Sequence, residues 1–149
     1  MKAIIQRVTA ASVQVDGSSV GEISNGLLIL LGIAPDDNEK DEEYLIQKIT
    51  QMRIFPDHEG KMNRSVVDVG GEILVVSQFT LFAETKKGNR PSFIHGAPPA
   101  IAKEKYEQWV NALKLRFPFK VATGIFGADM KVSLVNDGPV TIAIDSKNP

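Results

Sequence analysis

Hydrophobic and polar positions at the start of the chain have the spacing of strands. Residues 2–15 alternate with a period of two, and Asp16-Gly17 is a two-residue hairpin signal that leads into a returning strand over residues 20–23. Residues 26–34, GLLILLGIA, form a continuous apolar run that is typical of a strand buried on both faces. The opening segment is therefore predicted to be β-sheet.

Two later segments have the spacing of amphipathic helices. The first helix is predicted over residues 39–52, after three residues that make good N-caps, and a pair of prolines starts a second helix over residues 98–116. The residues expected to face the core are Leu45, Ile49 and Met52 in the first helix, and Ala102, Tyr106, Trp109 and Leu113 in the second. Each helix therefore presents one apolar stripe.

The remaining chain supplies further strands and a long loop. Residues 72–83, EILVVSQFTLFA, strongly favour a strand, and residues 120–126 and 131–145 are expected to close the sheet. Residues 84–98 show no periodicity, and ordered loops of this length are more often functional than loops in general. We expect one α+β domain over residues 1–149, with a mostly antiparallel, barrel-like β-sheet and two main helices.

Composition excludes several kinds of site. The chain has 149 residues, no cysteine and a formal net charge of −1. Without cysteine there are no disulfides, thiol nucleophiles or cysteine-type zinc sites, which fits a reducing cytoplasm. His58 and His95 are isolated in the sequence, so we expect no metal and no cofactor. The longest apolar run, residues 27–31, is too short to cross a membrane, and a cytoplasmic protein is expected.

Polar side chains interrupt the strand predicted over residues 72–83. Ser77, Gln78 and Thr80 place two hydroxyls and an amide among apolar neighbours. A buried polar group without a partner costs about 1–3 kcal/mol, so these groups form an internal network, a site, or a solvent-facing stripe at the strand end. Strand alternation predicts that Ser77 and Phe79 face one way, and Gln78 and Thr80 the other.

Two other segments carry candidate chemistry. Asn136-Asp137-Gly138-Pro139 interrupts the last strand, and taken alone it favours an ordinary tight turn, because proline removes a ladder donor. Lys86, Lys87 and Arg90 make the long loop basic. Such a loop suits a phosphate backbone, although a solvated basic loop has the same composition.

Six segments in order along the whole chain form a distinctive combination: MKAIIQRVTAASVQVDG, GLLILLGI, MRIFPDHEGKMNRSV, SQFTLFA, KKGNRPSF and NDGPVTI. Together they resemble the D-aminoacyl-tRNA deacylases of the common bacterial and eukaryotic type, whose two signature segments are SQFTL and NDGPVT. The resemblance implies a homodimer that hydrolyses the ester bond of D-aminoacyl-tRNA, and of mischarged glycyl-tRNA, and rejects L-aminoacyl-tRNA. This activity is a proofreading step in translation quality control.

The resemblance also implies roles for particular residues. Ser77 to Thr80 of one subunit would line the pocket, and Gly138-Pro139 of the other subunit, with a cis peptide bond, would enter it. Carbonyls of this motif would face the α-amino group of the substrate, and an L side chain would collide with the motif. Arg7 would help to hold the motif in orientation, and Met130 would lie beside the terminal adenosine of the tRNA.

The chemistry of ester cleavage has two candidate mechanisms. The Phe79 backbone N–H is a plausible oxyanion donor in both. Thr80 is the obvious candidate nucleophile, but no histidine or lysine nearby in the sequence offers itself as its base. In the alternative, which we favour, the terminal ribose 2′-OH of the tRNA positions or activates water. Ser77, Gln78 and Thr80 then organise the pocket.

Three competing functions belong to other classes. A non-catalytic tRNA-binding or RNA-binding module would use Lys86, Lys87 and Arg90 but would leave the ester intact. A generic esterase with Thr80 as nucleophile would act on small esters that lack tRNA. A purely structural dimer would respond to no ligand.

Overall fold

The computed structural model describes all 149 residues and has eight strands, two α-helices and one 3-10 helix. The strands are β1 (Lys2–Val15), β2 (Ser18–Ile23), β3 (Gly26–Gly32), β4 (Phe55–Pro56), β5 (Met62–Arg64), β6 (Glu72–Ser77), β7 (Val121–Thr123) and β8 (Lys131–Asp145). The helices are α1 (Glu39–Gln51), α2 (Pro99–Arg116) and the 3-10 helix η1 (Phe79–Phe82). The predicted α+β class with two main helices is confirmed.

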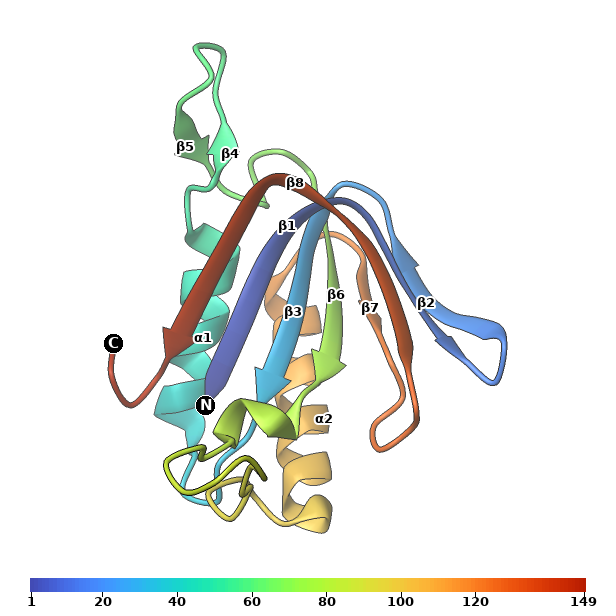
Figure 1. The fold of residues 1–149 in the computed structure, drawn as a ribbon. Coiled ribbons are helices and arrows are strands. Elements are labelled where there is room, and N and C mark those ends of the chain that lie inside the picture. Colours follow the sequence, from blue (N-terminus) through green and yellow to red (C-terminus); the bar gives the residue numbers. More distant parts are fainter.

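The strands form a six-stranded sheet in the order β2-β1-β3-β6-β7, with β8 paired to β1, and a separate β4–β5 hairpin. β1 is antiparallel to β2, β3 and β8, whereas β3, β6 and β7 run parallel to one another. The sheet curls into a nearly closed barrel (Figure 1). Closure brings β2 against β7, where a Cβ on Gly21 would lie 2.4 Å from the Thr123 carbonyl oxygen.

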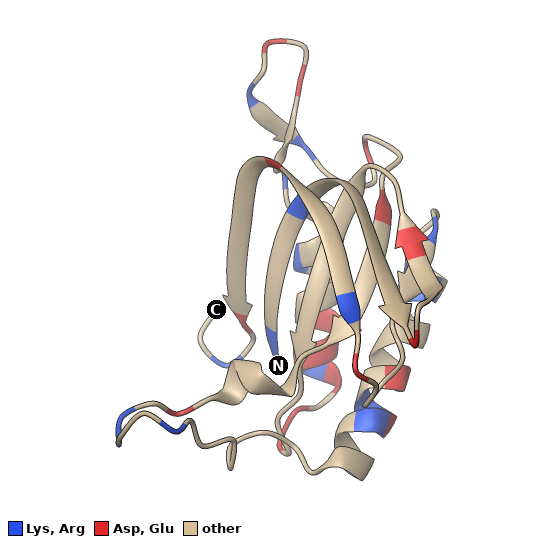
Figure 2. Ribbon diagram, turned by 45° about the vertical axis from the view of Figure 1, so that its right-hand side comes forward, with Lys and Arg blue, Asp and Glu red and all other residues tan.

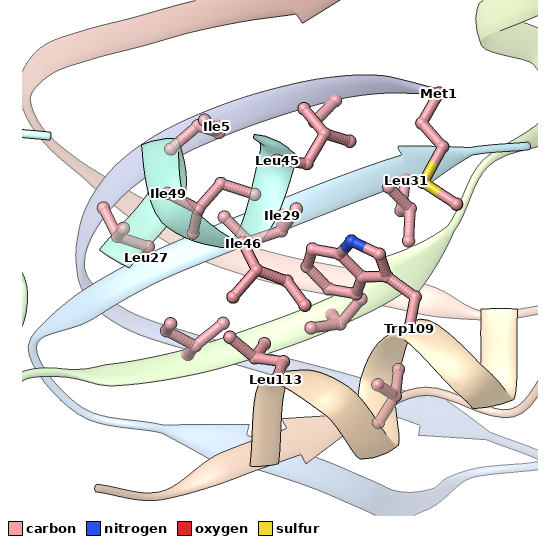
Figure 3. Packing of buried hydrophobic residues seen from close by; sticks show 14 of the residues in the cluster. Met1, Ile5, Leu27, Ile29, Leu31, Leu45, Ile46, Ile49, Trp109 and Leu113 are labelled. Atoms are coloured by element: carbon pink, nitrogen blue, oxygen red, sulfur yellow. The ribbon is translucent and has the colours of Figure 1, made fainter. Parts of the chain in front are cut away.

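The hydrophobic core has two parts, one on each face of the sheet. The larger part joins β1, β3 and β6 to both helices around Trp109, which is fully buried (Figure 3). The smaller part lies on the other face of the sheet and includes Val13, Leu28 and Leu74. Burying this apolar surface is the main stabilisation of the fold. Because α1 and α2 pack on the same face of the sheet in the larger part, this core also sets the position of both helices relative to the ends of the strands.

The predicted helices are confirmed, with a small change in the first. All four residues expected to face the core in α2 are buried. In α1, Leu45 and Ile49 are buried, but the helix ends at Gln51 and Met52 is its partly exposed C-cap. Asn38 is the N-cap and forms a capping box with Asp41.

Several predicted strand boundaries are wrong. β6 stops at Ser77, because the chain turns into η1, so residues 78–83 are not strand. β3 ends at Gly32, and only residues 121–123 of the predicted strand 120–126 pair with a neighbour. Residues 55–63, which are polar and rich in turn formers, include one side and the tip of the β4–β5 hairpin.

The last strand departs most clearly from the sequence prediction. β8 continues through Asn136-Asp137-Gly138-Pro139 instead of being broken by a tight turn. Its pairing with β1 jumps from Asn136 opposite Val8 to Thr141 opposite Gln6, so the residues between them bulge out of the ladder. A bulge accommodates proline without the loss of a ladder hydrogen bond, which explains why the strand does not end there.

Asp41 joins the start of α1 to the C-terminal segment. Its carboxylate accepts hydrogen bonds from the Ser146 hydroxyl at 2.7 Å, the Lys147 ammonium at 2.8 Å and the Asn38 backbone N–H at 2.9 Å. Burial alone would raise the pKa of Asp41, but these hydrogen bonds outweigh it and lower the pKa from 3.8 to about 2. The charged form is therefore stabilised in the folded protein.

We predict an acid-sensitive contribution from Asp41. Because its pKa is lower in the folded than in the unfolded chain, the contribution is complete above about pH 4 and disappears as the pH falls toward 2. Asp41→Asn should lower the free energy of unfolding by about 2 kcal/mol at pH 7 and flatten its pH dependence between these limits. Urea unfolding at a series of pH values measures both effects. Glu39→Gln, an exposed position in the same helical turn, is the control, and equal effects of the two variants would contradict the prediction.

Candidate active site

A cavity of about 650 Å³ opens where β3 and β6 end. Its walls come from the start of η1, the loop over residues 84–98, the first turn of α2 and the loop between β7 and β8. Twelve of its 19 lining residues are hydrophobic, and the polar side chains are those of Ser77, Gln78 and Asp129. A mostly apolar pocket with a few convergent polar groups is typical of a small-molecule or substrate site.

The end of β6 presents three consecutive residues to this cavity. Ser77 is the last residue of the strand, and the Gln78 N–H donates to the Leu31 carbonyl at 2.8 Å before the chain turns into η1. Ser77, Gln78 and Phe79 all line the cavity. The predicted strand alternation is therefore wrong here, since it required Gln78 to face away from its neighbours.

Thr80 supports the cavity from outside its lining. Its hydroxyl oxygen accepts a hydrogen bond from the side-chain amide of Gln78, which lines the cavity, whereas Thr80 itself does not. No hydrogen bond joins Thr80 to a histidine, lysine or carboxylate. As the first residue of η1, Phe79 has a backbone N–H without a partner inside that helix. The strand end thus offers an amide side chain, a hydroxyl and a free backbone donor.

Aromatic and thioether side chains surround the cavity mouth. The rings of Phe79 and Phe93 meet edge to face with their centroids 5.2 Å apart, and 58% of Phe79 is exposed. Met130 lines the wall formed by the β7–β8 loop. Gly124 makes room for Met130, since a Cβ on this glycine would lie 2.4 Å from the Met130 Sδ. Phe93 and Asp129 also line the cavity and were not predicted to do so, because single aromatic and acidic residues occur in many surface segments.

Gly138 and Pro139 do not line the cavity of their own subunit. Both are exposed, lie in the bulge of β8 and are joined by a cis peptide bond. β8 arches over the end of the molecule opposite η1 (Figure 1). Along β3, the cavity begins at Leu31, whereas Arg7, which contacts Gly138, pairs with Leu27. Four strand residues span about 13 Å, so the two candidate segments are at different ends of the sheet.

Arg7 is buried beneath the Gly138-Pro139 segment. Its Nε donates to the Asp137 carbonyl at 2.9 Å, and its Nη1 donates to the Ile54 carbonyl at 2.6 Å. A carboxylate oxygen of Asp137 lies 3.4 Å from Nε. The structure therefore joins Arg7 to the bulge of β8, although neither takes part in the cavity.

The basic residues lie on the loop that borders the cavity. Lys86, Lys87 and Arg90 are exposed, and Figure 2 shows them along the part of the loop that projects from the body. Two backbone hydrogen bonds between Glu84 and Ser92, of 2.8 and 3.0 Å, close the base of this projection. His95 contacts Glu84 at 3.0 Å, and the other histidine is exposed on the β4–β5 hairpin. No group of three or more metal-binding side chains is present, and no helix is long and apolar enough to span a membrane.

Comparison with known proteins identifies the family. The model of the D-Tyr-tRNA(Tyr) deacylase family matches residues 4–145. The chain belongs to this family. D-aminoacyl-tRNA deacylases of Thermosipho africanus and Cytophaga hutchinsonii are each 58% identical to it and align over 99% of its length, with 98% and 99% of their own lengths covered.

Two solved structures share this fold. A protein described as the c-Myc DNA Unwinding Element Binding Protein is 42% identical to this chain and superposes on it with a TM-score of 0.92. The superposition covers 97% of this chain and 98% of that protein's chain. A probable eukaryotic D-amino acid tRNA deacylase has a TM-score of 0.80 at 15% identity, over 96% of this chain and 97% of its own. This second likeness concerns the fold alone.

Proposed function

We propose that this chain is a D-aminoacyl-tRNA deacylase, which hydrolyses the ester between a D-amino acid, or a mischarged glycine, and the terminal ribose of tRNA. The observation that carries the proposal is the cavity lined by Ser77, Gln78 and Phe79 in a chain that matches the deacylase family over residues 4–145. An aminoacyl ester is already activated, so positioning and modest electrostatic stabilisation are sufficient for its cleavage. Such an enzyme would act in the cytoplasm, where tRNA is used.

The oxyanion of the reaction would form next to Phe79. Its backbone N–H is free of helical pairing and stands at the cavity wall, which is the arrangement that stabilises a tetrahedral intermediate. Ser77 and Gln78 would orient the ester, and the thioether of Met130 would contact the terminal adenosine. These roles divide the cavity into a polar side near β6 and an apolar side near the β7–β8 loop.

Thr80 is poorly placed to be a nucleophile. Its hydroxyl oxygen accepts a hydrogen bond from Gln78, and it contacts no side chain that could remove its proton. We therefore assign Thr80 the task of holding Gln78, and we assign the activation or positioning of water to the 2′-OH of the substrate's terminal ribose. The alternative, an esterase with a threonine nucleophile, requires a base that the local geometry does not supply.

Chiral selection would come from the Gly138-Pro139 segment of a second subunit. This segment cannot reach the cavity of its own subunit, since it lies at the opposite end of the sheet. In a two-fold symmetric homodimer, each segment would instead reach the other subunit's cavity, so that two equivalent sites result. The backbone carbonyls of Gly138 and Pro139, which are both exposed residues, would then hold the substrate ammonium without reading the side chain.

Discrimination between the two hands must arise from placement around Cα. A D-amino acid and its L form carry the same groups and have equal transfer free energies, so pocket hydrophobicity cannot separate them. With the ammonium and the ester both fixed, the L side chain points into the motif, whereas the D side chain points away. Glycine has no side chain and therefore passes this filter.

The basic loop would contact the phosphate backbone of the tRNA. Lys86, Lys87 and Arg90 are exposed beside the cavity mouth, and the loop that carries them also contributes Phe93 to the lining. Phosphate contacts of this kind set register and orientation, not sequence preference. The loop therefore suits an enzyme that accepts several tRNAs.

The proposal predicts a strong preference for the D form. Purified protein should release D-tyrosine from tRNA at least about 100-fold faster than L-tyrosine, a ratio that requires roughly 2.7 kcal/mol of discrimination. Measurement of the two hydrolysis rates on otherwise identical tRNA tests this prediction. Equal rates would refute chiral selection, and tight binding without ester loss would support a non-catalytic RNA-binding module. Cleavage of small esters without tRNA would favour the generic esterase.

The proposed role of the ribose predicts opposite effects of two changes. Thr80→Ala should retain activity within about tenfold of the wild type, since it removes only the partner of Gln78. A substrate with 2′-deoxyadenosine at its end should react at least about 100-fold more slowly, the usual contribution of an acid or base. Single-turnover rates compare the two directly. Wild-type decay of the deoxy substrate, together with an inactive Thr80→Ala, would establish the threonine mechanism instead.

The shared site predicts complementation between two inactive variants. One variant carries Gly138→Ala and Pro139→Ala, where the new Cβ at 138 would lie 3.0 Å from Val140 and 3.1 Å from Arg7. The other carries Gln78→Ala and Phe79→Pro, which removes the amide and the backbone donor. Mixed dimers should regain up to about half of wild-type activity, because one of their two sites is intact. If both variants fold and exchange subunits without regaining activity, each site lies within one subunit.

A further inference from the structure

The guanidinium of Arg7 connects two segments that are distant in the sequence. Its Nε binds the Asp137 carbonyl on the bulge of β8, and its Nη1 binds the carbonyl of Ile54 at the base of the β4–β5 hairpin. Only 11% of the Arg7 side chain is exposed. A buried guanidinium with its donors directed at two fixed carbonyls has little freedom to rotate.

The ring of Phe55 supports the guanidinium from a third direction. The Arg7 Cζ lies 5.9 Å from the centroid of this ring, within the range of a cation–π interaction. Phe55 is 2% exposed and belongs to the large core cluster, while its backbone pairs with Arg64 across the hairpin. The ring is therefore held in place by the core, and it provides a rigid surface for Arg7.

Arg7 in turn lies against Gly138. A Cβ at position 138 would be 3.1 Å from the Arg7 Nη2 and 3.0 Å from Val140, so a side chain there would crowd the guanidinium. Gly138 also has a φ of +130°, a conformation that side chains disfavour. A rotation of the guanidinium would also break its hydrogen bond to the carbonyl of Asp137, the residue before Gly138.

We propose that Phe55, together with the Ile54 carbonyl, is a positioning residue for chiral selection, because it fixes Arg7 and through it the orientation of Gly138-Pro139. The proposal rests on the function given above. Phe55 touches neither the cavity nor the substrate of its own subunit, and it acts only by limiting how far the motif can turn. Geometric errors of about 1 Å can cost a reaction as much as 100-fold. A filter that separates two mirror-image groups should be at least as sensitive.

Phe55→Leu tests the proposal, because leucine keeps an apolar side chain in the core and removes the aromatic surface under Arg7. We expect the ratio of D to L hydrolysis to fall by about tenfold or more, with the loss for the D substrate mainly in kcat. Phe117→Leu is the matched control: Phe117 is 4% exposed in the same core cluster and faces Phe119 instead of Arg7. This control should lose comparable stability and keep its D to L ratio.

Further variants keep the result interpretable. Phe55→Tyr retains the aromatic ring and should keep the wild-type ratio of D to L hydrolysis. If Phe55→Leu does not fold, Phe55→Met takes its place as the variant without the ring. In a double-mutant cycle with Arg7→Lys, the losses in the ratio should be less than additive, since both act through the same guanidinium contact. An unchanged ratio in every folded variant without the ring would overturn the proposal.

A measurement on the free protein, without substrate, tests the role of Phe55 independently of the proposed function. The amide resonance of Gly138 should shift in Phe55→Leu and stay in place in Phe117→Leu. If the wild-type protein does not hydrolyse D-aminoacyl-tRNA, the proposed function fails, but the resonance still reports whether Phe55 positions the motif. An unshifted resonance in Phe55→Leu would remove the physical link on which the proposal depends.

Discussion

β1 forms backbone ladders with three strands, β2, β3 and β8, and it curves along its length (Figure 1), with an irregularity in its pairing with β8 between Val8 and Ala10. The first half of the strand pairs with β3 and the second half with β2, so this curvature turns a flat sheet into a nearly closed barrel. A second irregularity in the ladder with β8 follows between Gln6 and Val8. At the second, residues 137–140 leave the ladder, which exposes Gly138-Pro139 above Arg7.

The other end of the sheet depends on an equally local change of backbone. β6 stops at Ser77 and the chain tightens into η1, so that three successive residues face one cavity. In a continued strand, every second side chain would have pointed away, and the Phe79 N–H would have been a ladder donor. The same turn brings the Thr80 hydroxyl within hydrogen-bonding distance of the Gln78 amide. The polar wall of the cavity is thus a consequence of where the strand ends.

The separation of these two ends is the structural basis of the composite site that we propose. Each end is rigid within its own subunit: the cavity wall is tied to β3 through Leu31, and the bulge of β8 is tied to the core through Arg7 and Phe55. Neither end can move toward the other without breaking the sheet. In the homodimer that we propose, a second copy of the chain would bring the two halves together without any conformational change.

The sequence by itself determined the features that depend on local periodicity and on motif identity. It predicted α2 with its buried stripe, the Asp16-Gly17 hairpin and the buried β3, because apolar spacing and turn chemistry are encoded by neighbouring residues. It also indicated the family through SQFTL and NDGPVT. Tertiary structure alone decided where β6 ends, how β8 survives its proline, and that Gly138 lies far from Ser77. All three features depend on the curvature of β1 and on contacts between distant residues, such as that of Arg7 with Ile54, 47 positions away. No local pattern in the sequence records such contacts.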